Sequence, residues 1–242
     1  MKERSILFNA PMVRAVLDDS KTQTRRIAKL TDAGHVKEPG GHRRWHPGDP
    51  NARLACPYGQ PGDRLWVREA WRIGAWCEDD EELAIDYLAS APEKTPWIEV
   101  PESAAFEKYW IQSSDDCIEA GVATDCNGDY HWEPGQSPCR KRPSIHMPRW
   151  ASRIMLEITA VRIERLQDIS EEDAIAEGIF RLEYGGQISW RDYSLDDEWA
   201  EVSPMLESPV DSYRTLWESI NGAGSWVANP FVWVVEFKKV TP

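Results

Sequence analysis

The sequence predicts an α+β protein, a small mixed β-barrel with helices packed around it and elaborated by two insertions. One observation is the order of patterned segments, which runs strand, helix, strand, insertion, long strands, helix, helix, strand. Another is the length of 242 residues, which suits one large domain. We expect a single domain over 1–242 with its core at about 1–71 and 144–242, an acidic insertion at 72–143 and a loop insertion at 183–207.

The first elements are a strand at 5–8 and a helix that begins near Asn9–Pro11, since proline is favoured at the first helical position. The basic run Lys21–Arg26 follows this helix directly, so it is expected at a junction between helix and strand. Residues 31–62 are dense in Gly and Pro, which predicts a long loop.

The middle of the chain holds the acidic insertion between two β-rich segments. After a turn at Pro61–Asp63, the alternation of Arg64–Trp71 predicts a strand. Within the insertion, Asp79–Leu88 has a helix-like pattern. The segment Ala151–Leu166 then predicts a long β stretch, because its apolar residues alternate.

The last third predicts two helices and a final strand. Ser170–Ile179 has a candidate N-cap, acids in its first turn and Gly178 near its end, as a helix requires. Ser208 and Pro209 open a second helix that stops at Gly222. The stretch between them supplies the predicted loop insertion, and Asn229–Val240 forms a strand with alternate large apolar residues on one face.

Charge is distributed unevenly along the chain. The net charge is −13, yet residues 78–137 alone hold sixteen Asp and Glu against two Lys. The rest of the chain is nearly neutral and keeps basic clusters at 25–29, 43–44 and 140–142. A long bare duplex would be repelled by the acidic segment, whereas a nucleoside or a short strand would be less affected.

Composition also restricts location and cofactors. No apolar run approaches the roughly 18 residues of a membrane span, so no membrane partner is expected and the protein is predicted to be cytoplasmic. The five cysteines are odd in number and include no CxxC pair, which argues against a disulfide framework. Cys117, Cys126, His131 and Cys139 have suitable ligand types but match no compact zinc spacing, so neither a metal nor a cofactor is expected.

The run Lys21-Thr22-Gln23-Thr24-Arg25-Arg26 carries the most suggestive chemistry. An amine at Lys21 and a hydroxyl at Thr24 stand three residues apart, so that one turn of backbone would bring both into one site. Threonine is a weak nucleophile that needs a base, and a lysine whose pKa is lowered by burial can serve. The plain alternative is a solvated basic turn after a helix.

With this run, Pro61-Gly62-Asp63, the segment from Gln167 to Gly178 and the aromatic strand Trp233–Phe237, the chain resembles the ASCH domains of the PUA-like superfamily. It is most similar to their longer phage and prophage versions. The likeness covers the predicted core but neither 72–143 nor 181–208. It implies a PUA-like β-barrel.

One branch of that family removes the acetyl group from N4-acetylcytidine, which implies an amidohydrolase for N-acylated pyrimidine nucleosides. Carried over by position, the catalytic residues are Lys21, Thr24 and Glu177, and Arg26 matches a substrate-binding arginine. The chain departs from the pattern at Arg25, where an apolar residue is usual, and in its two insertions. Arg25 beside Arg26 is a further candidate for holding a polar ligand.

Several alternatives stay open. Trp66 or Trp71 would stack on a base in the site, but alternating strand tryptophans also serve as core packing. Glu177 is equally an exposed acid at a helix end. The same cleft would suit a module that binds short RNA, single-stranded DNA or a modified base, or a ribonuclease, given the basic clusters. The acidic segment fits either a solvated lid or the docking surface of a phage regulatory factor.

Overall fold

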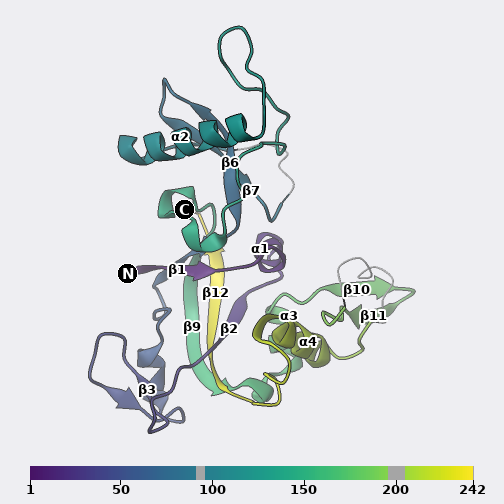
Figure 1. The fold of residues 1–242 in the computed structure, drawn as a ribbon. Helices are drawn as coiled ribbons and strands as arrows, with labels where there is room; N and C mark the ends of the chain where they lie inside the picture. The colour runs from purple at the N-terminus through teal and green to yellow at the C-terminus, as the bar shows by residue number, and fades with distance from the viewer. Residues whose placement is uncertain (91–95, 196–204, 242) are drawn as a thin grey trace. The chain divides into compact units, whose positions relative to one another are not determined.

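The structure, a computed structural model, describes residues 1–90, 96–195 and 205–241 and mixes helices with several sheets (Figure 1). The predicted α+β class is therefore confirmed. The chain divides into two compact units, which are described separately. The first unit comprises Met1–Arg4, Ala15–Leu65 and Met155–Thr241, and the second comprises Ser5–Arg14 and Trp66–Ile154.

A five-stranded sheet has the order β1 (Glu3–Leu7), β5 (Arg64–Arg68), β9 (Met155–Arg165), β12 (Phe231–Val240) and β2 (Gln23–Ile27). Strands β9, β12 and β2 belong to the first unit, and β12 runs antiparallel to both of its neighbours. The order is linear, and the described residues include no closed barrel.

Strand β12 is the centre of the first unit because it is buried on both faces. Val232 and Val234 pack in one hydrophobic cluster with residues of α3 (Glu171–Ala176) and α4 (Pro209–Asn221). Trp233 and Val235 alternate with them and are also buried, at 3% and 0% exposure. This alternation is the one expected from the sequence.

Helices α3 and α4 begin and end where their caps predict. The Ser170 hydroxyl accepts from the Asp173 amide at 3.1 Å, and the Ser208 hydroxyl does the same for Asp211 at 3.3 Å. Helix α4 ends at Gly222, which has a positive φ of 92°. The one-turn helix η4 (Leu166–Asp168) joins β9 to α3.

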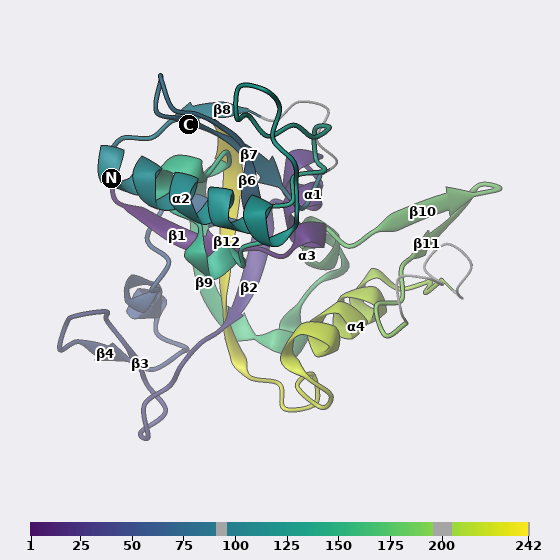
Figure 2. The ribbon, with the colours of Figure 1, turned by 45° about the horizontal axis from the view of Figure 1, so that its top comes forward.

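The predicted loop insertion is wrong at its start. Strands β10 (Arg181–Tyr184) and β11 (Gln187–Trp190) form a hairpin that extends away from α4 (Figure 2). A Gly-Gly pair with positive φ at both residues makes the two-residue turn, and Trp190 anchors the hairpin in the hydrophobic cluster. The part of that prediction over 196–204 lies outside the described residues.

The Gly- and Pro-rich segment 31–62 is largely loop, as predicted. It contains only the two-residue strands β3 (Val36–Lys37) and β4 (Arg44–Trp45) and the 3₁₀ helix η1 (Pro50–Ala55). Asp49 caps η1 by accepting from the Asn51 amide at 2.7 Å.

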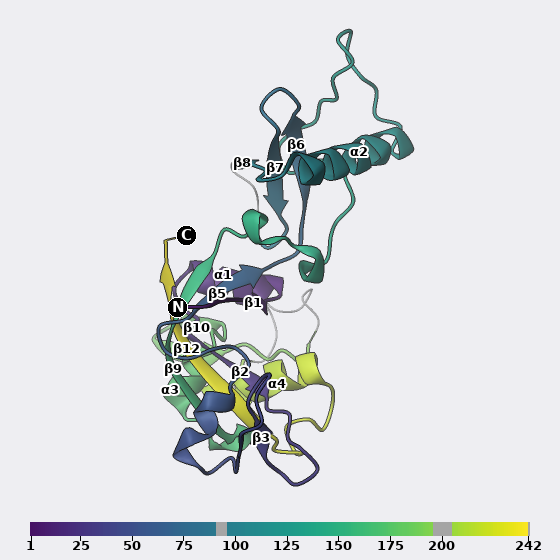
Figure 3. The same cartoon turned by 90° about the vertical axis from the view of Figure 1, so that its left-hand side faces the viewer.

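In the second unit, strands β6 (Trp71–Cys77), β7 (Glu82–Tyr87) and β8 (Trp97–Glu99) form an antiparallel sheet. Helix α2 (Ser103–Glu119) lies across this sheet (Figure 3). The 3₁₀ helices η2 (Ser144–His146) and η3 (Arg149–Ala151) follow later in the chain. Helix α1 (Ala10–Leu17) starts in this unit, where Asn9 caps it by accepting from the Met12 amide at 3.0 Å.

Two sequence expectations fail in the second unit. Asp79–Leu88 was expected to be helical, yet it contains β7, whose Leu83, Ile85 and Tyr87 are buried in the core. The charged residues before β7 resemble a helix surface, but pairing on both sides with β6 and β8 decides the conformation. The single strand expected over Arg64–Trp71 is divided into β5 and β6.

Candidate functional site

Lys21 and Glu177 meet inside the first unit although 156 residues separate them. The Lys21 ammonium donates to the Glu177 carboxylate Oε2 at 2.9 Å and to the Glu177 main-chain oxygen at 2.7 Å. The two backbones also form an isolated antiparallel bridge. With exposures of 3% and 4%, the pair is almost completely removed from solvent.

Local structure at the end of α3 positions Glu177. Glu177 is the C-cap, and the next residue, Gly178, has a φ of +78°. A Cβ at Gly178 would lie 2.7 Å from the Lys21 Cβ and 2.8 Å from the Ala15 Cβ. Glycine is therefore required both by the left-handed turn and by the close approach of Lys21.

Replacing Gly178 with alanine should destabilise the protein clearly more than the same change at Gly121. Gly121 follows α2 in the same C-terminal position with a φ of +67°, but a Cβ there would meet nothing within 4 Å. Gly121→Ala should therefore show only the left-handed backbone cost of roughly 1–2 kcal/mol. Gly178→Ala adds a clash that must displace Lys21. Equal losses of unfolding free energy in urea would show that a Cβ at Gly178 does not clash with Lys21.

Arg25 ties the Glu177 carboxylate to two further acids. Its guanidinium donates to Glu177 Oε1 at 3.2 Å, to Glu164 Oε1 at 2.6 Å and to Asp173 Oδ2 at 2.8 Å. Arg162 from β9 donates to the same Asp173 oxygen at 2.6 Å. The Arg25 side chain is fully buried, whereas Asp173 and Arg162 are partly exposed, so this network of charges runs from the interior to the surface.

Burial and neighbouring charges shift the pKa values of Lys21, Tyr213 and Asp173. Burial lowers the pKa of Lys21, and the attraction of Glu177 opposes that shift only in part. Burial also raises the pKa of Tyr213 well above its ordinary value, and the charge of Glu177 adds to the shift. Burial raises the pKa of Asp173, but hydrogen bonds from Arg25 and the charges of Arg25 and Arg162 outweigh it, so the net pKa is lowered. Of these three groups, Lys21 is the one whose pKa is shifted in the direction of neutral pH.

Thr24 and Arg26 lie on the face of β2 opposite to that of Arg25. The segment is extended from Gln23, so the turn of backbone expected to join Lys21 and Thr24 is absent, and residues three apart in a strand point to opposite faces. Arg26 donates to the Thr24 hydroxyl at 2.9 Å and to the Arg25 carbonyl at 3.1 Å. Thr24 is fully buried, and its hydroxyl is held by a cation.

A hollow of about 340 Å³ in the first unit lies beside this second face. Tyr58 and Trp233 line it together with Lys29 and Lys37. Trp233 is paired with Arg26 across β12 and β2, so both side chains share one face of the sheet. Burial raises the pKa of Tyr58, and the charge of Arg26 opposes that shift in part.

The two tryptophans proposed to stack on a base belong to the second unit. Trp71 is fully buried in that unit's core, beside Arg142 and Tyr109. Trp66 is half-buried, and the Arg68 guanidinium lies 5.4 Å from its ring. Trp71 therefore packs the core, and a stacking role for Trp66 stays a prediction.

Sequence reasoning missed the residues that surround Arg25 and line the hollow. Asp173 was attributed only to the first turn of α3, and Glu164 and Arg162 only to a strand. A signal for the last two exists, since charged residues two apart on a β-rich segment share a face. Tyr58 and Trp233 carry no such signal, because a loop and a strand far apart in the chain bring them together.

The candidate metal ligands Cys117, Cys126, His131 and Cys139 all belong to the second unit. Cys117 and Cys139 are buried in its core, Cys126 is exposed, and His131 contacts Asp125 at 2.9 Å. Within the described ranges, no group of three or more His, Cys, Asp or Glu could hold a metal ion. The same ranges contain no helix long and apolar enough to cross a membrane.

Neither a protein-family model, nor a curated protein, nor a solved structure matches the chain. Function is therefore inferred from the residues of the two units.

Proposed function

We propose that the chain is an amidohydrolase of the ASCH type that removes the acyl group from an N-acylated pyrimidine nucleoside such as N4-acetylcytidine. The observation that supports it most is the buried contact between the Lys21 ammonium and the Glu177 carboxylate, beside the strand that carries Thr24. A buried lysine whose pKa is lowered is the kind of base that a threonine nucleophile needs.

Because Lys21 and Thr24 point to opposite faces of the extended segment, the proposed reaction requires a rearrangement on substrate binding that brings the Lys21 amine to the Thr24 hydroxyl. The Thr24 hydroxyl oxygen then adds to the acyl carbonyl carbon while the neutral Lys21 amine takes the hydroxyl proton. The bond between the carbonyl carbon and the exocyclic nitrogen then breaks, and the amine leaves with that proton. Glu177 holds Lys21 in place and directs a water molecule at the acyl-threonine ester. Water cleaves the ester, which releases the acid and restores Thr24.

Arg26 has a role in binding. It already donates to the Thr24 hydroxyl, so a small shift would let it donate to an oxyanion or to the carbonyl of the pyrimidine. The arginine next to it in sequence, Arg25, is committed to three protein carboxylates and would act by fixing Glu177.

The test is acetate release from N4-acetylcytidine by the wild-type chain and by Thr24→Val. The matched control is Thr22→Val, an exposed threonine two residues earlier on the same run. We expect turnover by wild type and by Thr22→Val and a large loss in Thr24→Val. No turnover by the wild-type chain, or an equal rate in Thr24→Val, would contradict the proposed hydrolase.

A second candidate function, binding of short RNA, single-stranded DNA or a modified base, is favoured by the hollow beside Arg26. Tyr58 and Trp233 offer ring surfaces, and Lys29 and Lys37 offer phosphate contacts. A ribonuclease or a phage regulatory factor would use the same hollow. A gel shift with short RNA and single-stranded DNA at two salt concentrations distinguishes these uses from the hydrolase.

Under this second candidate, Lys29→Ser combined with Lys37→Ser should weaken binding and reduce its salt dependence. The control is Lys238→Ser, an exposed lysine of the same unit that pairs with Glu157 at the surface. Salt-sensitive binding without nucleoside turnover would replace the hydrolase proposal by this one.

The proposal extends to the fold and the setting. The sheet β1-β5-β9-β12-β2 would be the wall of a PUA-like barrel, with the acidic segment and the β10–β11 hairpin as additions. A cytoplasmic protein encoded by a phage or prophage is part of the same proposal.

A further inference from the structure

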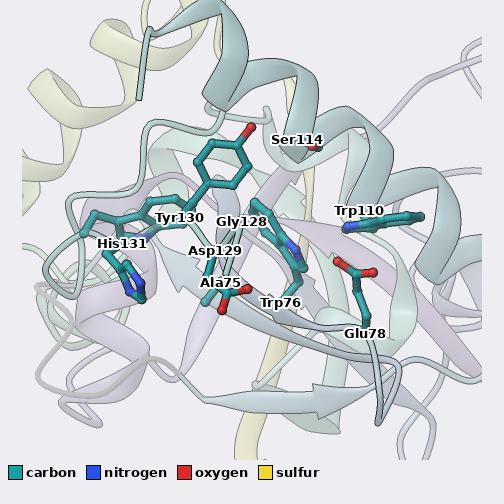
Figure 4. Close-up of a pocket in the computed structure, with 10 residues that line it drawn as sticks. Ala75, Trp76, Glu78, Trp110, Ser114, Gly128, Asp129, Tyr130 and His131 are labelled. Atoms are coloured by element: carbon teal, nitrogen blue, oxygen red, sulfur yellow. The ribbon is translucent and has the colours of Figure 1, made fainter. Parts of the chain in front are cut away.

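The second unit contains a hollow of about 530 Å³ with aromatic walls. Its lining includes Trp76, Trp110, Tyr130 and Trp132, together with the carboxylates Glu78 and Asp129 (Figure 4). Each of these four aromatic side chains is only partly buried, so each leaves part of its ring exposed to a ligand. This hollow plays no part in the proposed hydrolase.

The rings are held in place before any ligand arrives. Trp76 on β6 lies 5.8 Å from Trp132 and 6.0 Å from Tyr130, measured between ring centroids. The Trp132 indole donates to the Gly74 carbonyl at 2.6 Å, which fixes its orientation. All four rings also pack against the hydrophobic core of the unit. A ligand would therefore meet a wall that loses little conformational entropy on binding.

The segment that carries Asp129 and Tyr130 is also shaped by its own contacts. The Asp125 carboxylate accepts from the Asn127 amide at 2.8 Å and from the Asp129 amide at 3.0 Å. An isolated bridge joins Thr124 to Tyr130. Figure 4 shows Trp76 between Tyr130 on one side and Trp110 with Glu78 on the other.

The charge of the hollow favours a positively charged ligand. Its lining holds two acids and neither lysine nor arginine. Eight of its ten lining residues belong to the segment 78–137, which has sixteen acids against two lysines. A phosphate or a nucleotide would be repelled, whereas a cation would be attracted by the carboxylates and by the negative faces of the rings.

We propose that this hollow binds a small organic cation whose charge sits on an alkylated ammonium group. Ring faces attract such a cation electrostatically and also cover its methyl groups. Four aromatic rings suit methyl groups better than the N–H donors of a primary ammonium. The carboxylates of Glu78 and Asp129, two exposed residues that line the hollow, add electrostatic attraction for the cation.

The test uses choline and its neutral isostere 3,3-dimethylbutan-1-ol as probes in titration calorimetry of the full chain. We expect choline to bind and the neutral isostere to bind weaker by a factor on the order of ten, because shape and apolar surface are the same and only the charge differs. Equal binding of the two probes, or no binding of choline, would overturn the proposal.

Two pairs of variants locate the binding. Trp110→Leu should weaken choline binding by a factor on the order of ten, while Trp97→Leu, at a tryptophan that is 50% exposed and outside the lining, should leave it unchanged. Glu78→Gln should weaken binding by roughly two- to five-fold, the range of an exposed charge, and Glu99→Gln should have no effect. Circular dichroism checks that each variant is folded. A loss of equal size in either control would place the binding elsewhere and overturn the assignment.

Discussion

Acetate release from N4-acetylcytidine is expected to fall by roughly 10²–10⁴-fold when Lys21 is replaced by methionine, the range of one general base. Methionine keeps a long apolar side chain in the buried position but cannot take a proton. Glu177 would still be neutralised by Arg25, which contacts it at 3.2 Å, so the variant should fold. The measurement is the steady-state rate, with circular dichroism to verify folding.

The control for this prediction is Lys29→Met, an exposed lysine eight residues later in the chain. It should keep the wild-type rate of acetate release. The loss in Lys21→Met should appear in kcat, because a proton acceptor acts in the transition state rather than in substrate binding. A loss confined to KM would show that Lys21 only helps to bind the substrate.

The wild-type rate should also depend on pH in a defined direction. Only the neutral Lys21 amine accepts a proton, so the rate should rise with pH and level off above the pKa of Lys21. Since burial lowers that pKa, the plateau should begin below the ordinary lysine value of 10.5. A rate that keeps rising to that value would mean that Lys21 is not the base.

Replacing Arg25 with methionine is expected to destabilise the protein by about 3–5 kcal/mol, the cost of removing one partner from a buried ion pair. The change leaves Glu177, Glu164 and Asp173 without the cation that they share. Urea unfolding measures the difference. Arg214→Met is the matched control, because its pair with Asp211 is at the surface and should contribute less than about 1 kcal/mol.

Acid should reduce the difference between wild type and Arg25→Met. In the folded protein the pKa of Asp173 lies below its ordinary value of 3.8. The stability that this acid contributes is therefore fully present above pH 3.8 and is lost as pH falls through the lower folded value. In Arg25→Met the pKa of Asp173 returns toward normal, so less stability remains to be lost. An unchanged acid profile would mean that Arg25 does not set this pKa.

Much of the first unit was predictable because local signals agree with its tertiary structure. Helix α3 has the Ser170 cap and Gly178 at its end, and β12 has strict alternation, so each could be assigned from a few neighbouring residues. The β10–β11 hairpin was missed because its polar strands offer little apolar periodicity. Its formation depends on the Gly185-Gly186 turn and on the burial of Trp190.

The second unit was harder to predict because its core residues are interspersed with acidic residues in the sequence. Strand β7 follows a run of acids and was expected to be helical, but pairing with β6 and β8 makes it a strand. Helix α2 was not expected at all. Its buried positions include Ser113 and Asp116 as well as Phe106 and Cys117, so its inward face is not marked by hydrophobic residues.

The candidate site was predictable only in part. The pairing of Lys21 with Glu177 came from resemblance, and the structure brings the two side chains together. The spacing argument for Lys21 and Thr24 failed because it assumed a turn where the chain is extended. The contacts of Arg25 with Glu164 and Asp173 span 139 and 148 residues, and no local pattern specifies such distant partners.

The most direct measurement is peptide mapping by mass spectrometry after rapid quenching of the Glu177→Gln variant with N4-acetylcytidine. Glu177 is proposed to direct the water that cleaves the ester, so this variant should accumulate the intermediate. We predict one acetyl group on Thr24, in the peptide that follows Lys21. A substrate that is left intact, or one that is consumed while Thr24 stays unmodified, would contradict the proposed hydrolase.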